Sequence, residues 1–249
     1  MARLDISVDR KYFNSDSIAN GRLIGNFLDT LANNVFSQSY RHWKSYRDMV
    51  KICELPLLYG ERNLYSIFAA AINKITPVHL SEWSFSKTDR PDKPDKKSAE
   101  PDKSRRVDFW CLNKEGDNGK RLNYFIEVKK TGYCLSAGTQ EGFTDDACFK
   151  VKELEGQIKK LKGKKPDWYG DGDVFLGILV IHGYYAKGKK PSYDENHLRE
   201  NIHRLLDRRL KAQLFVSTWA LPDEMEVQWD SHRCKFILIA GIAITKKIR

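Results

Sequence analysis

The sequence has little of what marks secreted, membrane-spanning or disulfide-bonded proteins. Its five cysteines are scattered and form no CxxC pair, which argues against a disulfide framework and against a zinc ribbon. No long apolar run follows the charges at the N-terminus, so a signal peptide is not expected. The longest apolar run, residues 236–244, is too short to cross a bilayer as a helix. We therefore expect a soluble protein in a reducing, cytoplasmic compartment, with no membrane partner.

Signatures of several enzyme classes are also missing. No Gly-x-Ser-x-Gly occurs, and the six histidines show no spacing typical of metal ligands. Residues 183–189 fit the pattern GxxxxGK of a phosphate-binding loop, but Lys190 stands where that loop needs Ser or Thr, and Pro191 interrupts the helix that should follow. These differences argue against an NTPase and favour a basic loop that leaves the sheet.

The chain does contain an excess of basic charge and enough aromatic side chains for a core. Its 249 residues carry a net charge of +10, and aromatic residues make up 12%. A chain of this length buries a full core without cross-links. The positive charge favours a polyanionic partner, of which nucleic acid is the commonest, although ordinary solvated lysine faces also add up to such a value.

Hydrophobic periodicity predicts one α/β domain over residues 1–249. Apolar residues at three- and four-residue spacings predict helices over 17–53, 60–74, 146–162 and 194–211. Alternating or continuous apolar runs predict strands over 82–86, 106–113, 122–130, 174–182, 213–218 and 235–245. We expect a mixed, twisted central sheet with helices on both faces. Residues 1–55 would form a helical extension, residues 60–182 a catalytic core, and residues 183–249 a C-terminal helix and strands.

Residues 87–106 form a charged segment in which Pro-Asp-Lys occurs three times. Eight basic and five acidic residues leave this segment no means of burying a core, so we expect a flexible loop. Two interpretations stay open, a plain solvated loop and a loop that touches a phosphate backbone.

Three chemically informative residues lie on the predicted hairpin. Asp108 is near the start of its first strand, and Glu127 and Lys129 are near the end of its second. Two-residue periodicity places Glu127 and Lys129 on one face, and pairing across the turn at 114–119 places Asp108 opposite residues 125–128. The flanking residues are apolar, and charges buried among them need a partner or a metal.

This set of side chains suits metal-assisted hydrolysis. Two carboxylates with a nearby backbone carbonyl can hold Mg²⁺, which activates water and offsets charge on a phosphate. A neighbouring ammonium can hold or deprotonate that water, or stabilise the developing negative charge. The alternative is a surface ion pair of Glu127 and Lys129.

Asp108 followed, after a hairpin, by Glu127-Val128-Lys129 resembles the signature of the PD-(D/E)XK nuclease superfamily. The order of predicted elements over residues 60–182 is similar to the core of that superfamily, a restriction-endonuclease-like fold. The resemblance implies metal-dependent cleavage of phosphodiester bonds, usually in DNA, with Mg²⁺ or Mn²⁺ as the cofactor. It implies that Asp108, Glu127 and the carbonyl of Val128 hold the metal and that Lys129 is the catalytic lysine.

Two further positions match residues that members of the superfamily often carry. Glu61 lies on the apolar stripe of the helix before the strands, where it would act in catalysis and orient a second ion. The alternative is an acid that the dipole favours in the first helical turn. Gln157, on the helix after the lysine strand, could reach the site or a phosphate, and the alternative is a polar residue at the border of the apolar stripe.

Basic segments flank the proposed site in the sequence. Residues 150–165 hold seven lysines against two acids, and residues 187–211 hold eight lysines and arginines against four acids. The candidates for contact with a nucleic-acid backbone are Lys130, Lys150, Lys159, Lys160, Lys187, Lys189 and Lys190. The alternative is that these segments are ordinary solvated faces.

The patterns together predict a Mg²⁺-dependent endonuclease that hydrolyses DNA, with RNA as an open alternative substrate. Because cutting both strands of DNA takes two active sites, the interpretation includes a homodimer. Two other functions stay open from the sequence. One is a non-catalytic nucleic-acid-binding protein on the same scaffold, and the other is a module whose basic surface binds an acidic protein.

Overall fold

The computed structural model describes residues 4–9, 13, 15–51, 55–84, 106–115, 119–135, 142–162, 170–188, 194–207, 213–222, 225, 227–229 and 232–245. Over these residues the helices are η1 (Ser15–Ser17), α1 (Gly21–Val50), η2 (Pro56–Leu58), α2 (Glu61–Asn73), α3 (Ala147–Lys162) and α4 (Glu195–Asp207). The strands are β1 (Asp5–Asp9), β2 (His79–Ser84), β3 (Arg106–Glu115), β4 (Lys120–Cys134), β5 (Gly142–Phe143), β6 (Gly172–Ala186), β7 (Gln213–Ala220), β8 (Gln228–Trp229) and β9 (His232–Thr245). The mixture of helices and strands confirms the α/β class.

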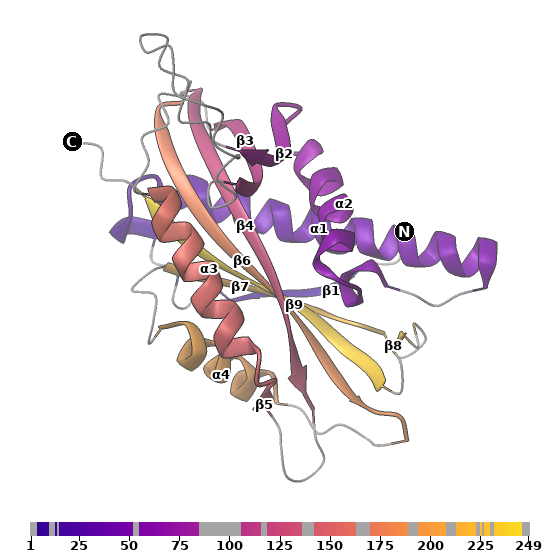
Figure 1. Cartoon of the computed structure of the whole chain (residues 1–249). Coiled ribbons are helices and arrows are strands. Elements are labelled where there is room, and N and C mark those ends of the chain that lie inside the picture. The colour runs from indigo at the N-terminus through magenta and orange to yellow at the C-terminus, as the bar shows by residue number, and fades with distance from the viewer. Residues whose placement is uncertain are drawn as a thin grey trace, which may run out of the picture.

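The described strands form one nine-stranded sheet in the order β1-β7-β9-β6-β4-β3-β2, with β5 beside β4 and β8 beside β9. Neighbouring strands are antiparallel except for β4 and β6, which run parallel. The long strands β4, β6 and β9 lie side by side at the centre of a strongly twisted sheet (Figure 1). The prediction of a mixed, twisted central sheet is therefore confirmed.

Helices cover both faces of this sheet, as expected (Figure 1). Helices α1 and α2 pack on one face, where the rings of Phe27 and Tyr124 stack with their centroids 3.8 Å apart. Helices α3 and α4 pack on the other face through residues that include Leu154 and Leu198. Successive residues of β4 point to opposite faces, so Tyr124 belongs to the first core and Phe125 to the second.

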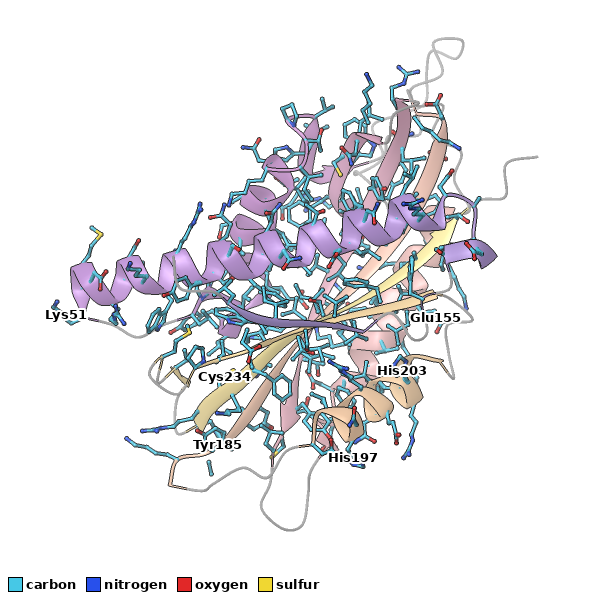
Figure 2. All side chains as sticks on the ribbon, turned by 180° about the vertical axis from the view of Figure 1, so that it is seen from behind. Lys51, Glu155, Tyr185, His197, His203 and Cys234 are labelled. Carbon is cyan, nitrogen blue, oxygen red and sulfur yellow. The ribbon has the colours of Figure 1, made fainter. Side chains whose placement is uncertain are left out.

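The first 55 residues differ from the expected helical extension. Residues 5–9 form β1, which pairs with β7 at the edge of the sheet. Helix α1 lies across the strands and buries a stripe that includes Ile24, Leu28, Leu31 and Val35, while Lys51 lies at its far end (Figure 2). Strand β9, from the other end of the chain, lies between β7 and β6. Residues 5–9 and 232–245 are thus both part of the same sheet.

The bounds of several elements also differ from those predicted. The first long helix begins at Gly21 because Ser15–Ser17 forms a 3-10 turn before it. Strand β6 continues to Ala186, so the run that fits GxxxxGK begins inside a strand rather than in a phosphate-binding loop. Residues 87–105 of the charged segment lie outside the described residues, and Arg106 begins β3. No helix in the described part of the chain is long and apolar enough to cross a membrane.

Candidate active site

The β3–β4 hairpin brings Asp108 to Glu127. Phe109 pairs with Ile126 in this antiparallel hairpin. One residue further in the same register, Asp108 lies opposite Glu127, within the range of residues 125–128 predicted from the turn. The backbone N–H of Val128 donates a hydrogen bond of 2.8 Å to Oδ2 of Asp108. The carboxylate therefore takes a donor that a strand neighbour would ordinarily satisfy, and the hairpin fixes its position.

Helix α2 supplies a second donor to the same carboxylate. The hydroxyl of Tyr65 donates to Oδ1 of Asp108 over 2.6 Å, and the Tyr65 ring packs edge-on against Phe109. Burial and the neighbouring Asp108 raise the pKa of Tyr65 above its usual range, so the phenol stays a donor. Sequence reasoning missed Tyr65. The available signal was its position four residues after Glu61, which places both side chains on one face of a helix.

The two carboxyl groups share a buried environment. Glu127 is 1% exposed, and burial followed by the charge of Asp108 raises the pKa of Glu127 to about 9, while Lys129 opposes the shift. Burial also raises the pKa of Asp108, against the hydrogen bonds from Tyr65 and Val128. Burial and the closeness of the two carboxyl groups thus oppose a negative charge on both at once. Within the described structure, Oε1 of Glu127 has no hydrogen-bond partner.

Lys129 lies on the same face of β4 as Glu127 and is 6% exposed. Its ammonium is 3.8 Å from Oε2 of Glu61, the first residue of α2, and the ammonium of Lys150 on α3 is 3.3 Å from Oε1 of Glu61. Glu61 therefore joins α2, β4 and α3 through two lysines, and it reaches the predicted catalytic lysine. Its predicted role as a metal ligand stays a prediction, because both of its oxygens face ammonium groups here.

Helix α3 approaches the sheet beside Glu127. Glu127 pairs across the parallel strands with Gly177, and a side chain at Gly177 would meet Leu154 and Ile158 of α3. The absence of a side chain at this position lets the helix pack directly on β6. Gln157 lies between those two α3 residues, and its buried Oε1 has no hydrogen-bond partner among the described residues. The structure thus places Gln157 on the helix that packs on Gly177 next to Glu127, and its role stays a prediction.

The predicted backbone-binding lysines fall into different environments. Lys130 was expected to contact a phosphate. In the structure its ammonium donates to the carbonyls of Leu58 and Tyr59, and burial lowers its pKa to about 8. Lys150 is engaged by Glu61 and Glu153. The exposed members are Lys159, Lys160 and Lys187. Lys189 and Lys190 lie outside the described residues.

In the part of the chain that the structure describes, two carboxyl groups, those of Asp108 and Glu127, meet at this site. Among the described residues, no group of three His, Cys, Asp or Glu side chains is placed to hold a metal ion. Comparisons of the chain with protein-family models, curated proteins and solved structures found no match. The functional conclusion therefore depends on the chemistry of Asp108, Glu127 and Lys129.

Proposed function

We propose that this chain is a Mg²⁺-dependent nuclease that hydrolyses phosphodiester bonds in DNA, as its resemblance to the PD-(D/E)XK superfamily implies. The observation that carries the proposal is the pair of half-buried Asp108 and buried Glu127, with the buried Lys129 ammonium beside them. Two acids buried against each other cost stability, since like charges and desolvation both oppose ionisation. Acids held in this way are typical of functional sites.

The donor set suits a hard divalent cation. The unpartnered Oε1 of Glu127 and the adjacent Asp108 carboxylate are the oxygen ligands that Mg²⁺ and Mn²⁺ prefer. Asp108, Glu127 and the carbonyl of Val128 would hold the ion, with Glu61 as a further predicted ligand. When bound, the ion supplies positive charge that lowers the pKa of a coordinated water and offsets charge on the phosphate.

The other proposed catalytic and positioning roles belong to side chains of this protein. Lys129 can donate a hydrogen bond to the attacking water or to a phosphoryl oxygen, where its charge offsets the negative charge of the transition state. Glu61 orients the Lys129 ammonium through their contact. Tyr65 and the Val128 N–H hold both oxygens of Asp108 in place. The apolar neighbours of the pair keep bulk water away and strengthen these interactions.

Cleavage of supercoiled plasmid and of single-stranded DNA tests the proposal. Both substrates are incubated with the wild type in Mg²⁺, in Mn²⁺ and in EDTA, beside Lys129→Ala and Lys114→Ala. Lys114 is exposed near the turn of the same hairpin and controls for the loss of one positive charge. We expect metal-dependent cleavage that survives Lys114→Ala and is lost in Lys129→Ala. Equal activity of both variants would contradict the assignment of Lys129.

One observation favours a second candidate, a nucleic-acid-binding protein without catalysis. Glu61 is paired with lysines, so only two carboxylates converge in the described structure. A wild type that cleaves neither substrate in either metal, yet binds DNA in a salt-sensitive way, would support this candidate. A wild type that does not retain DNA at modest salt would contradict both candidates and favour a basic module for an acidic protein.

A further inference from the structure

Beside the acid pair, the edge of β4 has a gap in its pairing. Strand β3 pairs with β4 up to Ile126, and β5 resumes pairing at Tyr133. Between them, residues 127–132 have no ladder partner on this side among the described strands. Asp108, Glu127 and Lys129 occupy the first half of this gap, and a cavity occupies the second half.

The cavity has a volume of about 500 Å³, within the range of roughly 300–1,000 Å³ that small-molecule sites occupy. It lies between the start of α2, the open edge of β4, the start of α3 and the end of β6. Its walls are formed by Gly60, Glu61, Lys130, Thr131, Gly132, Thr144, Asp146, Lys150, His182 and Tyr184. Because these residues come from distant parts of the sequence, only the fold brings them together.

One wall of the cavity is aromatic. The rings of His182 and Tyr184 lie 5.6 Å apart with an interplanar angle of 30°, and His232 supports Tyr184 edge-on at 5.1 Å. Burial lowers the pKa of His182 to about 3, so this ring is neutral at physiological pH. A neutral aromatic wall offers a planar ligand a face on which to stack, in the way that proteins bind unpaired bases.

Hydrogen-bonding groups line the cavity beside this aromatic wall, since a Cβ at Gly132 would meet Thr144, His182 and Tyr184 together. The hydroxyl of Thr131 is 3.1 Å from that of Thr144 and 3.3 Å from Oδ1 of Asp146. Hydroxyls and a carboxylate offer both donors and acceptors, which is what the edge of a nucleobase requires. The cavity has two lysines and two acids in its lining, so its charge is balanced. This balance suits an uncharged base and sugar better than a free polyphosphate.

Glu61 connects the cavity to the catalytic lysine. It lines the cavity and is 3.8 Å from the Lys129 ammonium and 3.3 Å from that of Lys150. A strand whose phosphate lies at Lys129 would therefore have its neighbouring nucleoside at the mouth of the cavity. In a fully paired duplex that nucleoside is stacked and paired, and moving it out of the helix costs the free energy of unstacking and unpairing.

We propose that this cavity holds one unpaired nucleoside next to the cleaved phosphate, so that the enzyme acts on single strands or on duplexes with an extrahelical nucleotide. The inference rests on the proposed nuclease function and extends it to the class of substrate. The base stacks on Tyr184, whose ring packs against those of His182 and His232, while its edge meets the Thr131, Thr144 and Asp146 groups.

Gly60 provides the test. It lines the cavity, precedes α2 as its N-cap with φ −56° and ψ 163°, and a Cβ there would meet nothing within 4 Å. The backbone at Gly60 therefore accepts a side chain, and we expect the ring of Gly60→Phe to occupy part of the cavity. Gly156→Phe is the matched control, because Gly156 also has open space around it and lies outside the cavity lining. Thermal unfolding of both variants verifies that each is folded.

The first measurement compares cleavage of a paired duplex with cleavage of the same duplex carrying one extrahelical nucleotide. We expect the wild type and Gly156→Phe to prefer the unpaired substrate at least tenfold, and Gly60→Phe to lose that preference. A wild type that cleaves both duplexes equally, or a Gly60→Phe variant that keeps the preference, would overturn the proposal while leaving the nuclease function standing.

The second measurement is independent of catalysis. The affinity for a fluorescein-labelled oligothymidylate is measured by anisotropy in Ca²⁺ at constant salt. We expect Gly60→Phe to weaken binding about tenfold and Gly156→Phe to leave it unchanged. If the wild type cleaves nothing but this difference is observed, the nuclease function fails and the nucleoside site stands. If binding is the same in both variants, the nucleoside site is refuted.

Discussion

Asp108 receives its two hydrogen bonds from donors of different kinds. The Val128 N–H belongs to the hairpin that carries Asp108, whereas the Tyr65 hydroxyl comes from α2 across the sheet edge. The backbone bond survives any substitution of side chains, so the contribution of Tyr65 can be measured alone. A group of this kind orients a ligand without touching substrate.

Tyr65→Phe is expected to lower the cleavage rate at limiting Mg²⁺ by roughly 10–100-fold, the range found for groups that orient metal ligands. The loss occurs because Asp108 keeps its charge but loses the 2.6 Å bond that fixes Oδ1. The measurement is the Mg²⁺ concentration that gives half-maximal activity, which should rise. Tyr46→Phe, on the exposed part of α1, is the control. An unchanged Mg²⁺ requirement in Tyr65→Phe would show that Tyr65 is only a packing residue.

The raised pKa of Glu127 implies that its carboxyl group lowers the stability of the metal-free protein while serving the proposed function. Its folded-state pKa of about 9 exceeds the ordinary value of 4.5, so between these pH values the unfolded chain releases a proton that the native protein retains. The metal-free wild type therefore loses stability as pH rises from about 4.5 to about 9. Glu127→Gln removes this effect and is expected to stabilise the EDTA-treated protein by about 1–4 kcal/mol while abolishing cleavage.

Urea unfolding at pH 6 and pH 9 in EDTA checks this expectation. The advantage of Glu127→Gln over the wild type should be larger at pH 9, and adding Mg²⁺ should raise the stability of the wild type alone. A variant that is less stable than the wild type at both pH values would show that the carboxyl is a structural hydrogen-bonding group instead.

At the scale of elements, α3 packs closely on β6 because Gly177 has no side chain. A Cβ at Gly177 would lie 3.0 Å from Cγ of Leu154 and would also meet Ile158. Gly177→Ala is therefore expected to cost roughly 1–3 kcal/mol of stability by overpacking, and to reduce cleavage by moving α3 away from Glu127.

Gly156→Ala, in α3 itself, is expected to change stability in the opposite direction. Gly156 lies inside α3, where a Cβ would meet nothing within 4 Å, so alanine should stabilise the protein by about 0.5–1 kcal/mol. Differential scanning calorimetry of the two variants measures both effects. A stable, fully active Gly177→Ala variant would contradict the view that close packing of α3 positions the site.

The hairpin was predictable because its signals are local. The turn, the alternating apolar residues and the apolar flanks all lie within residues 106–130, and they fix the register that joins Asp108 to Glu127. Strand β1 was not predictable, since its five residues pair with β7, more than two hundred positions away. The contacts of Lys130 were not predictable, because only the fold brings Leu58 and Tyr59 over its ammonium.

Tyr65 and the cavity were missed for a related reason. An aromatic residue on an apolar helical stripe is indistinguishable from a core residue until its hydroxyl is seen to meet Asp108. The cavity depends on where β3 stops and β5 begins along β4, and neither end has a sequence signal. Local patterns thus identified the acid pair, whereas long-range packing determined what surrounds it.

At the scale of the whole molecule, the net charge of +10 predicts DNA binding that weakens with salt, but it does not show which face binds. Alanine at Lys159, Lys160 and Lys187 removes three exposed charges from the basic segments that follow the site in the sequence. Alanine at Lys44, Lys51 and Lys114 removes the same charge elsewhere on the surface. Comparing the two triple variants therefore distinguishes phosphate contacts made by the first three lysines from a general attraction between the positive protein and DNA.

If the first three lysines each meet a phosphate, their loss should reduce the slope of log K against log salt by about 2.7, at about 0.9 per contact. The second triple variant should retain the slope of the wild type and lose only a little affinity, because screened charges beyond about 10 Å at 0.1 M salt contribute weakly. Fluorescence anisotropy with labelled duplex at several salt concentrations in EDTA measures both slopes. Equal slopes in the two variants would mean that the phosphate backbone does not lie along α3 and the end of β6.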